Sequence, residues 1–336
     1  MWTQDGWEMI KMAVEQQTQS RKLQCGNCQA ENNIPPFASV VTCEYCGTPN
    51  ELQTGKTFQN HHMLQVYFSG SLLQELIPEY LSKYVGVPTD FADKAVFTEF
   101  ELRMMPFWMF KFHGHTDYQG LGKYCPGGHS QMWSRSIDIQ TRPERGSIDL
   151  DQTCLIFGYG EKHKEIRDEK IPVGAKEAFD MSAVRAEGGK IYDTEIGYQD
   201  AFRMAEDQVK ARHSQLIYRE IFKIDGMNQN INMKEVSYLH VPFYRVVYNY
   251  GNWKGEALVD AARGKVLRAE YPVSRSHRFW GLAFIIAAIG IIGGAIYLAL
   301  QQPLWQIAGI AAAVIFAGLL IFGIKETLTK KKVAAE

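Results

Sequence analysis

The clearest chemical signal in the sequence lies near the N-terminus, where four of the six cysteines form two close pairs. The pairs are Cys25-Gly-Asn-Cys28 and Cys43-Glu-Tyr-Cys46, separated by 14 residues. A C-x2-C knuckle places two thiolates on one tight turn, and two knuckles supply the four sulfur ligands that Zn²⁺ binds in tetrahedral geometry. We therefore predict that Cys25, Cys28, Cys43 and Cys46 hold one structural zinc ion.

Four protein sulfurs leave no open position for water, so metal-assisted hydrolysis is not expected at this site. Iron in a rubredoxin-like site and redox-active thiols are the alternatives. Gly47 follows the second knuckle and permits its turn, whereas Gln29 occupies the matching place after the first. A module of this size buries little apolar surface, so metal binding is expected to provide most of its folding energy.

A second group of metal-binding residue types lies in the segment FHGHTDYQGLGKYCPGGH. Its members are His113, His115, Cys125 and His129. Their spacing matches no known metal fingerprint, and a His-x-His pair on a strand is usually ordinary surface or core. We expect no metal there.

Other motifs give no catalytic signal. Gly158-Tyr159-Gly160 lacks the third glycine and the following helix of a nucleotide-binding loop, and Cys154 lies in an apolar segment where it is expected to pack as a small hydrophobe. We find no G-x-S-x-G, HExxH or Walker A motif and no paired carboxylates. The chain is therefore predicted not to be an enzyme, with a membrane-bound enzyme or sensor as the alternative.

The elements around the cysteines indicate an α+β protein. We expect an N-terminal helix at 1–20, a zinc ribbon at 21–50 and an antiparallel cytosolic body at 61–273. Apolar residues at helical spacing follow Ser71, a candidate N-cap, but Pro78 is expected to kink or break that helix. Aromatic and β-branched residues from 95 to about 160 predict strands, and a second helix is expected to open near Gly197.

A faint internal repeat suggests that the body consists of two related halves. Met105-Pro-Phe-Trp108 and Val241-Pro-Phe-Tyr244 each follow a helical segment and lead into an aromatic stretch ending in glycine. Chance similarity of two aromatic strands is the alternative. The body closes with a predicted hairpin in which Gly264 supplies positive φ, and this ending resembles small antiparallel domains of the PepSY type.

Two uncharged segments near the C-terminus predict a transmembrane hairpin. Residues 279–300 and 304–324 each exceed the roughly 20 residues needed to span a bilayer as a helix. Basic residues flank both outer ends, and the connecting loop has none, so by the positive-inside rule both termini and the large domain are expected in the cytoplasm. Residues 325–336 form a basic cytosolic tail in this interpretation.

The predicted spans carry small residues at four-residue spacing, such as Gly290 with Gly294 and Gly309 with Ala313. These faces favour close helix packing within the hairpin, and they also allow a homo-oligomer. Neither span contains an acid, a base or a histidine, so no proton or ion path is expected.

Composition limits the partners. The 336 residues contain 36 Lys and Arg against 37 Asp and Glu, so the chain lacks the basic excess typical of duplex-binding domains. Nucleic-acid binding by the ribbon is therefore an unfavoured alternative. The opening residues have no apolar core of a secretory signal, and paired cysteines in a reducing compartment indicate a metal rather than disulfides.

The order of these parts resembles that of bacterial TFIIB-type zinc-ribbon-containing membrane proteins. The resemblance rests on the ribbon, the Pro-Phe-Trp and Pro-Phe-Tyr strands, the segment VDAARGKV and the terminal membrane hairpin. That group is associated with PspA/Vipp-type (ESCRT-III-like) and flotillin-like membrane-stress systems. It implies a zinc-ribbon adaptor in the cell membrane that recruits a peripheral membrane-associated protein of those classes, with no inherited catalytic residues.

Overall fold

The described part of the chain contains both helices and strands, with more residues in strands than in helices. The computed structural model describes residues 21–124, 140–160, 163–274, 279, 283, 285–294, 297 and 331–335. The strands are β1 (Lys22–Gln24), β2 (Glu31–Asn33), β3 (Val40–Thr42), β4 (Pro49–Glu51), β5 (His61–Met63), β6 (Ala95–Tyr124), β7 (Gln140–Phe157), β8 (Glu177–Ala178), β9 (Lys190–Ile191), β10 (Ile221–Tyr250), β11 (Trp253–Asp260), β12 (Lys265–Pro272) and β13 (Lys331–Ala335). The helices are α2 (Gly70–Ser82), α3 (Phe91–Lys94), α4 (Lys164–Arg167), the 3₁₀ turn η2 (Val173–Ala175), α5 (Met181–Ala186) and α6 (Tyr198–Glu220).

The chain divides into two compact units. Unit 1 comprises Met1–Gln65 and Arg103–Pro242, and unit 2 comprises Val66–Leu102 and Phe243–Glu336. The long strands β6 and β10 therefore each contribute one segment to each unit. The body predicted at 61–273 is shared between the units, and the predicted ribbon belongs to the same unit as much of that body.

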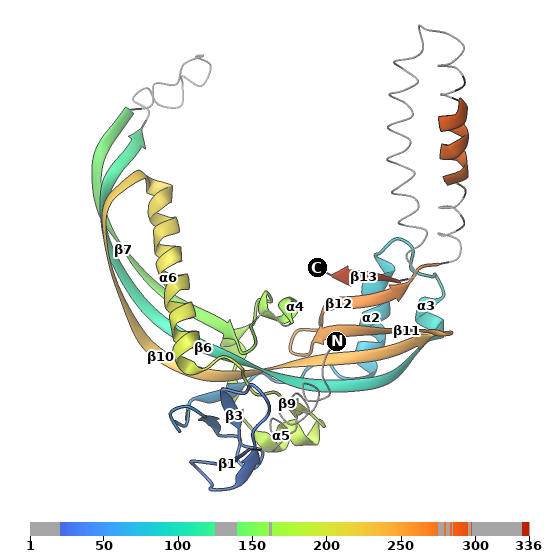
Figure 1. Ribbon diagram of the computed structural model, residues 1–336, viewed down its shortest axis with the longest axis horizontal. Helices are drawn as coiled ribbons and strands as arrows, with labels where there is room; N and C mark the ends of the chain where they lie inside the picture. Colours follow the sequence, from blue (N-terminus) through green and yellow to red (C-terminus); the bar gives the residue numbers. More distant parts are fainter. Residues whose placement is uncertain are drawn as a thin grey trace, which may run out of the picture. The chain divides into compact units, whose positions relative to one another are not determined.

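In unit 1, α6 covers a curved sheet of three long strands. The hairpin of β6 and β7 is antiparallel from Phe107↔Phe157 to Tyr124↔Gln140, and β10 also pairs with β6. Helix α6 lies along the inner side of this sheet (Figure 1). Its buried residues recur every four positions and so form one face: Ala201, Ala205, Val209, His213 and Ile217. The helix follows Gly197, as the sequence predicts.

Aromatic rings fill the core between α6 and the sheet. Trp108 is fully buried, with its ring centroid 4.8 Å from that of Phe58 and 4.9 Å from that of Tyr238, both edge to face. Its indole N–H donates to the carbonyl oxygen of Ile196 at 2.9 Å. Val40 of β3 belongs to the same buried cluster. The N-terminal strands thus share a core with α6 and the long strands.

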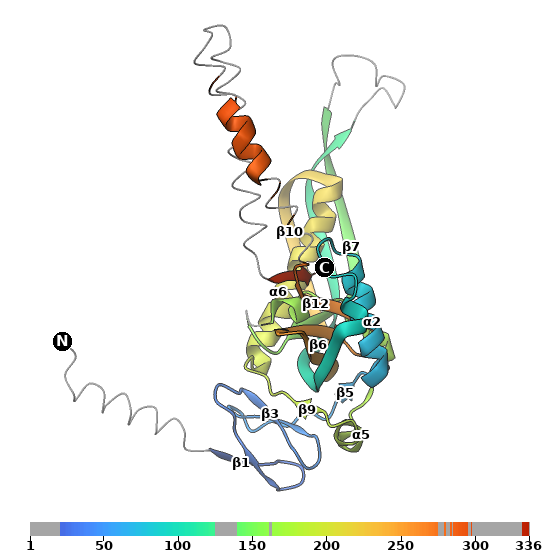
Figure 2. The same cartoon turned by 90° about the vertical axis from the view of Figure 1, so that its right-hand side faces the viewer.

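In unit 2, the second segment of β10 begins an antiparallel sheet that continues through β11 and β12. Helix α2 packs on β12, as Figure 2 illustrates. The turn between β11 and β12 contains Gly264 at φ +67°, which confirms the predicted hairpin, and a side chain at this position would collide with the ring of Phe68. Buried Asp260 accepts hydrogen bonds from the backbone N–H groups of Ala262 and Arg263.

A short C-terminal strand completes this sheet. β13 pairs antiparallel with β12, with Lys331 opposite Pro272 and Ala335 opposite Arg268. Part of the predicted basic tail is therefore a strand of unit 2. The register also brings the two ends of the segment between Pro272 and Lys331 side by side.

Helix α2 differs from its prediction in two ways. Its N-cap is Ser69 rather than Ser71, and it continues through Pro78 to Ser82, so of the predicted kink or break the break does not occur. Pro78 is buried on the same helix as Leu73 and Ile77. Burial of this apolar face compensates for the backbone hydrogen bond that proline cannot make.

Several predicted segments lie outside the described residues: the helix at 1–20, the span at 304–324, much of the span at 279–300, and residues 325–330. Within 279–300, residues 285–294 are helical. Among the residues that the structure describes, none of the helices combines the length and hydropathy required to cross a membrane.

We predict that Trp108→Ala destabilises unit 1 by about 3–5 kcal/mol, because it leaves a cavity in a fully packed aromatic core. Denaturant unfolding followed by circular dichroism measures this change. Tyr218→Ala, which truncates an aromatic residue of α6 that is 62% exposed, is the control and is expected to shift stability by less than about 0.5 kcal/mol. Equal effects of the two substitutions would contradict the assignment of this core.

Candidate metal centre

Two matching turns present the four cysteines. The hairpin of β1 and β2 carries Cys25 and Cys28, and that of β3 and β4 carries Cys43 and Cys46. In the first turn, the N–H of Gln29 donates to the carbonyl oxygen of Cys25 at 3.0 Å. In the second turn, the N–H of Gly47 donates to the carbonyl oxygen of Cys43 at 2.9 Å.

The residue that closes each turn has positive φ. Gly47 has φ +73° and Gln29 has φ +63°, so the first knuckle adopts the glycine-type conformation without a glycine. The two turns are therefore alike, although Gln29 stands in the first where Gly47 stands in the second. Both knuckles are shaped to direct their thiols toward one point.

The four sulfurs cluster closely, and two of their pairs lie at the separation that a tetrahedral metal site requires. All four ligand atoms lie within 4.8 Å of one another, with 3.7 Å between Cys25 Sγ and Cys46 Sγ and 3.6 Å between Cys28 Sγ and Cys43 Sγ. Zinc–sulfur bonds of about 2.3 Å at tetrahedral angles give sulfur separations of roughly 3.8 Å. A disulfide would need about 2.05 Å. The predicted residues therefore come together in an arrangement that can bind a metal ion.

Hydrogen-bond donors surround the sulfurs. The N–H of Asn27 points to Cys25 Sγ at 3.4 Å, and the side-chain amides of Asn32 and Asn50 point to Cys43 Sγ at 3.4 Å and Cys25 Sγ at 3.7 Å. Donors of this kind stabilise thiolates and orient them. The surroundings suit sulfur in its ionised, metal-binding form.

The protonation of the thiols shows why a cation is needed here. Burial and hydrogen bonds involving Thr48 act in opposite directions on Cys46, and the net effect lowers its pKa to about 6. For Cys28, a backbone hydrogen bond from Ala30 is outweighed by desolvation and the neighbouring sulfurs, which raise its pKa to about 12. Four thiols this close cannot all ionise unless a metal ion balances their charge.

The cysteine module is joined to the rest of unit 1 by hydrogen bonds from backbone N–H groups. The N–H of Ser39 donates to the carbonyl oxygen of Thr194 at 2.7 Å, and that of Thr42 donates to Asp193 Oδ1 at 2.7 Å. At the other end of the module, Glu51 Oε1 accepts from the N–H of Tyr198 at 3.0 Å. Tyr198 is the first residue of α6, so Glu51 satisfies a free donor at that helix end.

A pair of histidines links the second knuckle to β10. His61 Nδ1 lies 2.7 Å from the carbonyl oxygen of Gly47, and His61 Nε2 lies 2.8 Å from His240 Nδ1. Burial lowers the pKa of both imidazoles, that of His240 to about 4, so the pair is neutral at pH 7. A neutral pair carries two protons, which suffice for these two short contacts. No proton then remains for the longer contact, 3.3 Å between His240 Nε2 and the carbonyl oxygen of Tyr192.

Asp193 is the acidic group at the junction between module and core. Although part of its surface reaches solvent, protein encloses its carboxylate, and this burial raises its pKa to about 7. The N–H of Thr42 opposes that effect, and the negative charge of Glu44 adds to it. The contact between module and core therefore depends on pH in the neutral range.

The other candidates from the sequence do not join the cysteine cluster. His113 and His115 lie on β6 and face aspartates, and Cys154 is buried, which raises its pKa to about 11. Cys125 and His129 lie outside the described residues. Gly158 fits closely against Pro106 and Thr194, which explains that glycine without a nucleotide.

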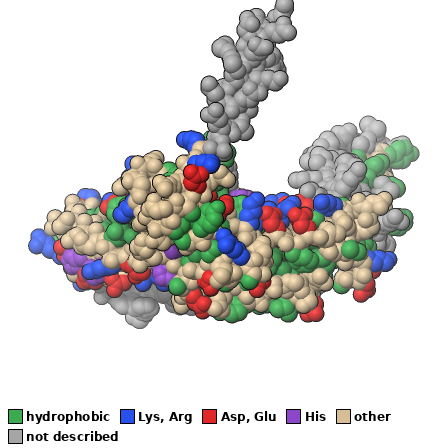
Figure 3. Space-filling model, turned by 90° about the horizontal axis from the view of Figure 1, so that it is seen from below, with side chains coloured by type: hydrophobic (Ala, Val, Ile, Leu, Met, Phe, Trp, Pro, Cys, Tyr) green, Lys and Arg blue, Asp and Glu red, His purple; other side chains and the backbone are tan. Residues whose placement is uncertain are grey.

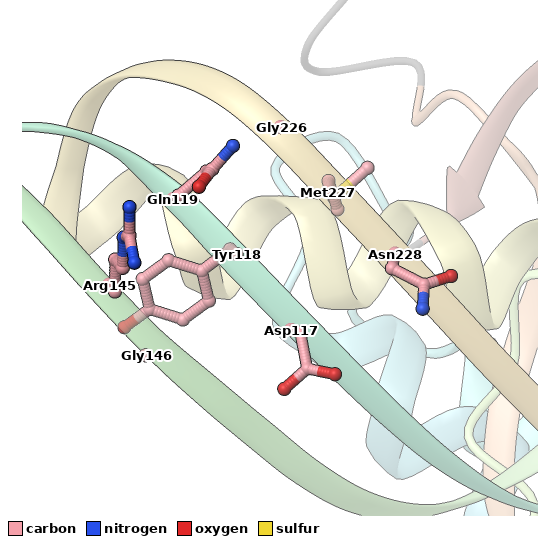
Figure 4. A pocket seen from close by; sticks show the side chains of 8 residues that line it. All are labelled: Asp117, Tyr118, Gln119, Arg145, Gly146, Gly226, Met227 and Asn228. Carbon is pink, nitrogen blue, oxygen red and sulfur yellow. The ribbon is translucent and has the colours of Figure 1, made fainter.

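A shallow pocket of about 400 Å³ lies farther along the β6–β7 hairpin, beside β10 (Figure 4). It is lined by Asp117, Tyr118, Gln119, Arg145, Gly146, Gly226, Met227 and Asn228. The hydroxyl of Tyr118 donates to Glu220 at 2.6 Å, and this bond raises the pKa of Tyr118 to about 12. The tyrosine is therefore not available as a base at neutral pH, and the pocket shows no catalytic constellation.

The comparison with family models gives no match, and neither do the comparisons with curated proteins and with solved structures.

The sequence analysis missed the residues around the cysteines. Asn32 and Asn50 lie next to no ligand in the sequence, and Asp193 and His240 come from distant segments. His61 lies closer to the ribbon in the sequence, but the stretch that contains it has the polar composition of a linker. Asp193 and His240 come close to the cysteine module only in the folded chain.

We predict that Asp193→Asn stabilises the protein at pH 8 by about 1–3 kcal/mol, with the gain shrinking toward zero near pH 4. A carboxyl whose folded pKa is raised contributes full stability below its unfolded pKa of 3.8 and loses it as the pH rises through about 7. Thermal unfolding across this pH range measures the effect. Asp168→Asn, at a side chain 57% exposed, is the control, and a difference for Asp193→Asn that does not vary with pH would contradict the argument.

Proposed function

We propose that Cys25, Cys28, Cys43 and Cys46 hold one structural Zn²⁺ ion that closes a zinc ribbon. The separations of 3.6 and 3.7 Å between opposite sulfur pairs carry this proposal, because they match a tetrahedral site of four thiolates. Asn32 and Asn50 orient the buried sulfurs of Cys43 and Cys25. With all four positions taken by sulfur, the ion supplies folding energy and no reacting ligand.

The function that best fits such a closed site is that of a non-enzymatic, membrane-anchored adaptor. In this proposal, residues 279–300 and 304–324 form two antiparallel transmembrane helices, as their length and lack of charge favour. The pairing of Pro272 with Lys331 supports this arrangement, because it holds both ends of the intervening segment together on one side of the membrane. The basic flanking residues place that side in the cytoplasm.

The ribbon is the proposed docking surface for the partner. It exposes two aromatic side chains, Phe37 at 77% and Tyr45 at 62%. Phe37 also adopts φ +67°, an unfavourable conformation for a residue with a side chain. Exposed aromatic residues of this kind act as anchors in protein interfaces. The resemblance to TFIIB-type zinc-ribbon membrane proteins makes a peripheral PspA/ESCRT-III-like or flotillin-like protein the favoured partner.

We predict that Cys43→Ser removes one equivalent of zinc and also loosens the start of α6. Loss of the ion releases the module, and Glu51 then no longer accepts the N–H of Tyr198. Elemental analysis measures the metal, and hydrogen exchange over the first turn of α6 measures the loosening. Cys154→Ala removes a cysteine outside the cluster and should retain the zinc. Full zinc occupancy in Cys43→Ser, or unchanged exchange in α6, would contradict this coupling.

We predict that the double substitution Phe37→Ala and Tyr45→Ala reduces partner recovery at least tenfold while zinc content stays the same. Both side chains are exposed, so their truncation should not disturb the ribbon. The measurement is the amount of a stoichiometric peripheral protein that co-purifies with the detergent-extracted chain, with Tyr218→Ala as the exposed aromatic control. Undiminished recovery with the double variant would exclude this surface, and recovery of no partner from the wild type under several extraction conditions would count against an adaptor.

A further inference from the structure

Away from the cysteines, five ionisable side chains share one face of the β6–β7 hairpin. We call this group the histidine–aspartate ladder: His113, His115 and Asp117 on β6, with Asp149 and Asp151 on β7. The strand register places His113 opposite Asp151 and His115 opposite Asp149. Alternate residues of a strand point to the same face, so all five side chains lie together. They are between 38% and 86% exposed, and Figure 3 shows histidine and acidic side chains close together on the surface.

Asp149 lies between the two imidazoles. Its Oδ1 is 2.8 Å from His115 Nδ1 and 4.0 Å from His113 Nε2. The opposite ring nitrogens face the other aspartates, with 2.9 Å between His113 Nδ1 and Asp151 Oδ1 and 3.3 Å between His115 Nε2 and Asp117 Oδ1. Each imidazole therefore has a carboxylate on both sides.

This arrangement leaves a place for positive charge at Asp149. A neutral imidazole carries one proton for the two carboxylates that it faces, so one ring nitrogen of each histidine keeps a lone pair. His115 donates its proton to Asp149 at the shorter distance, 2.8 Å, and His113 donates to Asp151 at 2.9 Å, which leaves the lone pair of His113 Nε2 facing Asp149. A bound cation can take the place of the proton between His115 and Asp149 and also accept the lone pair of His113.

We propose that the ladder binds a divalent transition-metal ion through His113 Nε2, His115 Nδ1 and Asp149 Oδ1. Nitrogen and oxygen ligands about 2.0–2.2 Å from a tetrahedral zinc ion lie roughly 3.3 Å apart. Among the described residues, only the four cysteines already stand at metal-binding separations, so the ladder has to rearrange to bind an ion. Rotation of these exposed side chains has to lengthen the 2.8 Å pair, shorten the 4.0 Å pair and bring the two imidazole nitrogens to the same spacing. Asp151 and Asp117 act as the outer carboxylates that orient metal-binding histidines.

The ligand chemistry defines the class of ion. Two imidazoles and one carboxylate favour Zn²⁺ and its neighbours such as Ni²⁺ and Cu²⁺ over Mg²⁺ and Ca²⁺, which prefer oxygen alone. Three protein ligands on an exposed face leave a position for water. The ladder is therefore a site of exchangeable metal, unlike the closed cysteine site. The proposal uses only ligands among the described residues, and Cys125 and His129 have no part in it.

The test is a calorimetric titration of the full-length, detergent-extracted chain with Zn²⁺ after its cysteine site has been loaded. We expect the wild type to bind one further equivalent. The double variant His113→Gln and His115→Gln should lose that equivalent and keep the first, and Asp149→Asn should weaken it at least tenfold. Asp151→Asn should weaken it about 10–100-fold, as expected of a residue that orients a ligand.

His163→Gln, at an exposed histidine outside the ladder, is the matched control and should bind the further equivalent like the wild type. Thermal unfolding of each variant verifies the fold, and histidine-ring NMR should show Zn²⁺-dependent shifts at His113 and His115. The absence of a further equivalent in the wild type would overturn the proposal. Equally strong uptake by the double variant would also overturn it, since the binding would then be nonspecific. Cys43→Ser affects only the first equivalent, so failure of the cysteine proposal is distinguishable.

Discussion

Four sulfur atoms within 4.8 Å of one another cannot all be ionised unless a cation neutralises them, and this electrostatic constraint underlies the order of unit 1. The cysteines close the turns from which β3 and β4 extend. β3 in turn places Val40 in the aromatic core and Thr42 against Asp193. Glu51 at the end of β4 satisfies the first N–H of α6. An ion bound by the four cysteines would thus stabilise a helix that contains none of its ligands.

The junction between the cysteine module and the core combines the apolar contact of Val40 with polar contacts. Asp193, with its raised pKa, contacts Thr42 of β3, and the neutral His61–His240 pair contacts Gly47 of the second knuckle. The buried imidazoles resist protonation, whereas the enclosed carboxylate resists ionisation, so acid opposes the first contact and favours the second. The two contacts are therefore expected to be strongest together between about pH 4 and pH 7, where the imidazoles are neutral and the carboxyl is protonated.

The sequence predicts the parts of this protein better than their connections. The C-x2-C spacing identified all four clustered cysteines, and the 3.6-residue periodicity located α6, because both signals are local. The periodicity that indicated α2 was also correct, but the rule that proline breaks a helix failed at Pro78, where burial outweighs the lost hydrogen bond. Contacts such as Ser39 to Thr194 join segments more than 150 positions apart, and no short window contains them. The aspartates of the ladder could not be identified from the sequence for the same reason. Asp149 and Asp151 lie opposite His115 and His113 only in the strand register of the folded protein.

In the proposed assignment, the number and chemistry of the ligands separate a permanent metal site at the cysteines from an exchangeable one at the ladder. Cys25 and Cys43 are fully buried beside amide donors, whereas Cys28 and Cys46 are exposed, so an ion held there would be shielded from solvent on one side and closed off on the other by two thiolates. The ladder presents softer nitrogen and harder oxygen atoms on an open sheet face, where water completes the coordination. On these proposals, the fold would depend on the ion at the cysteines and not on the ion at the ladder. The ladder would then fill and empty with ambient metal, while the ribbon and the start of α6 stayed ordered.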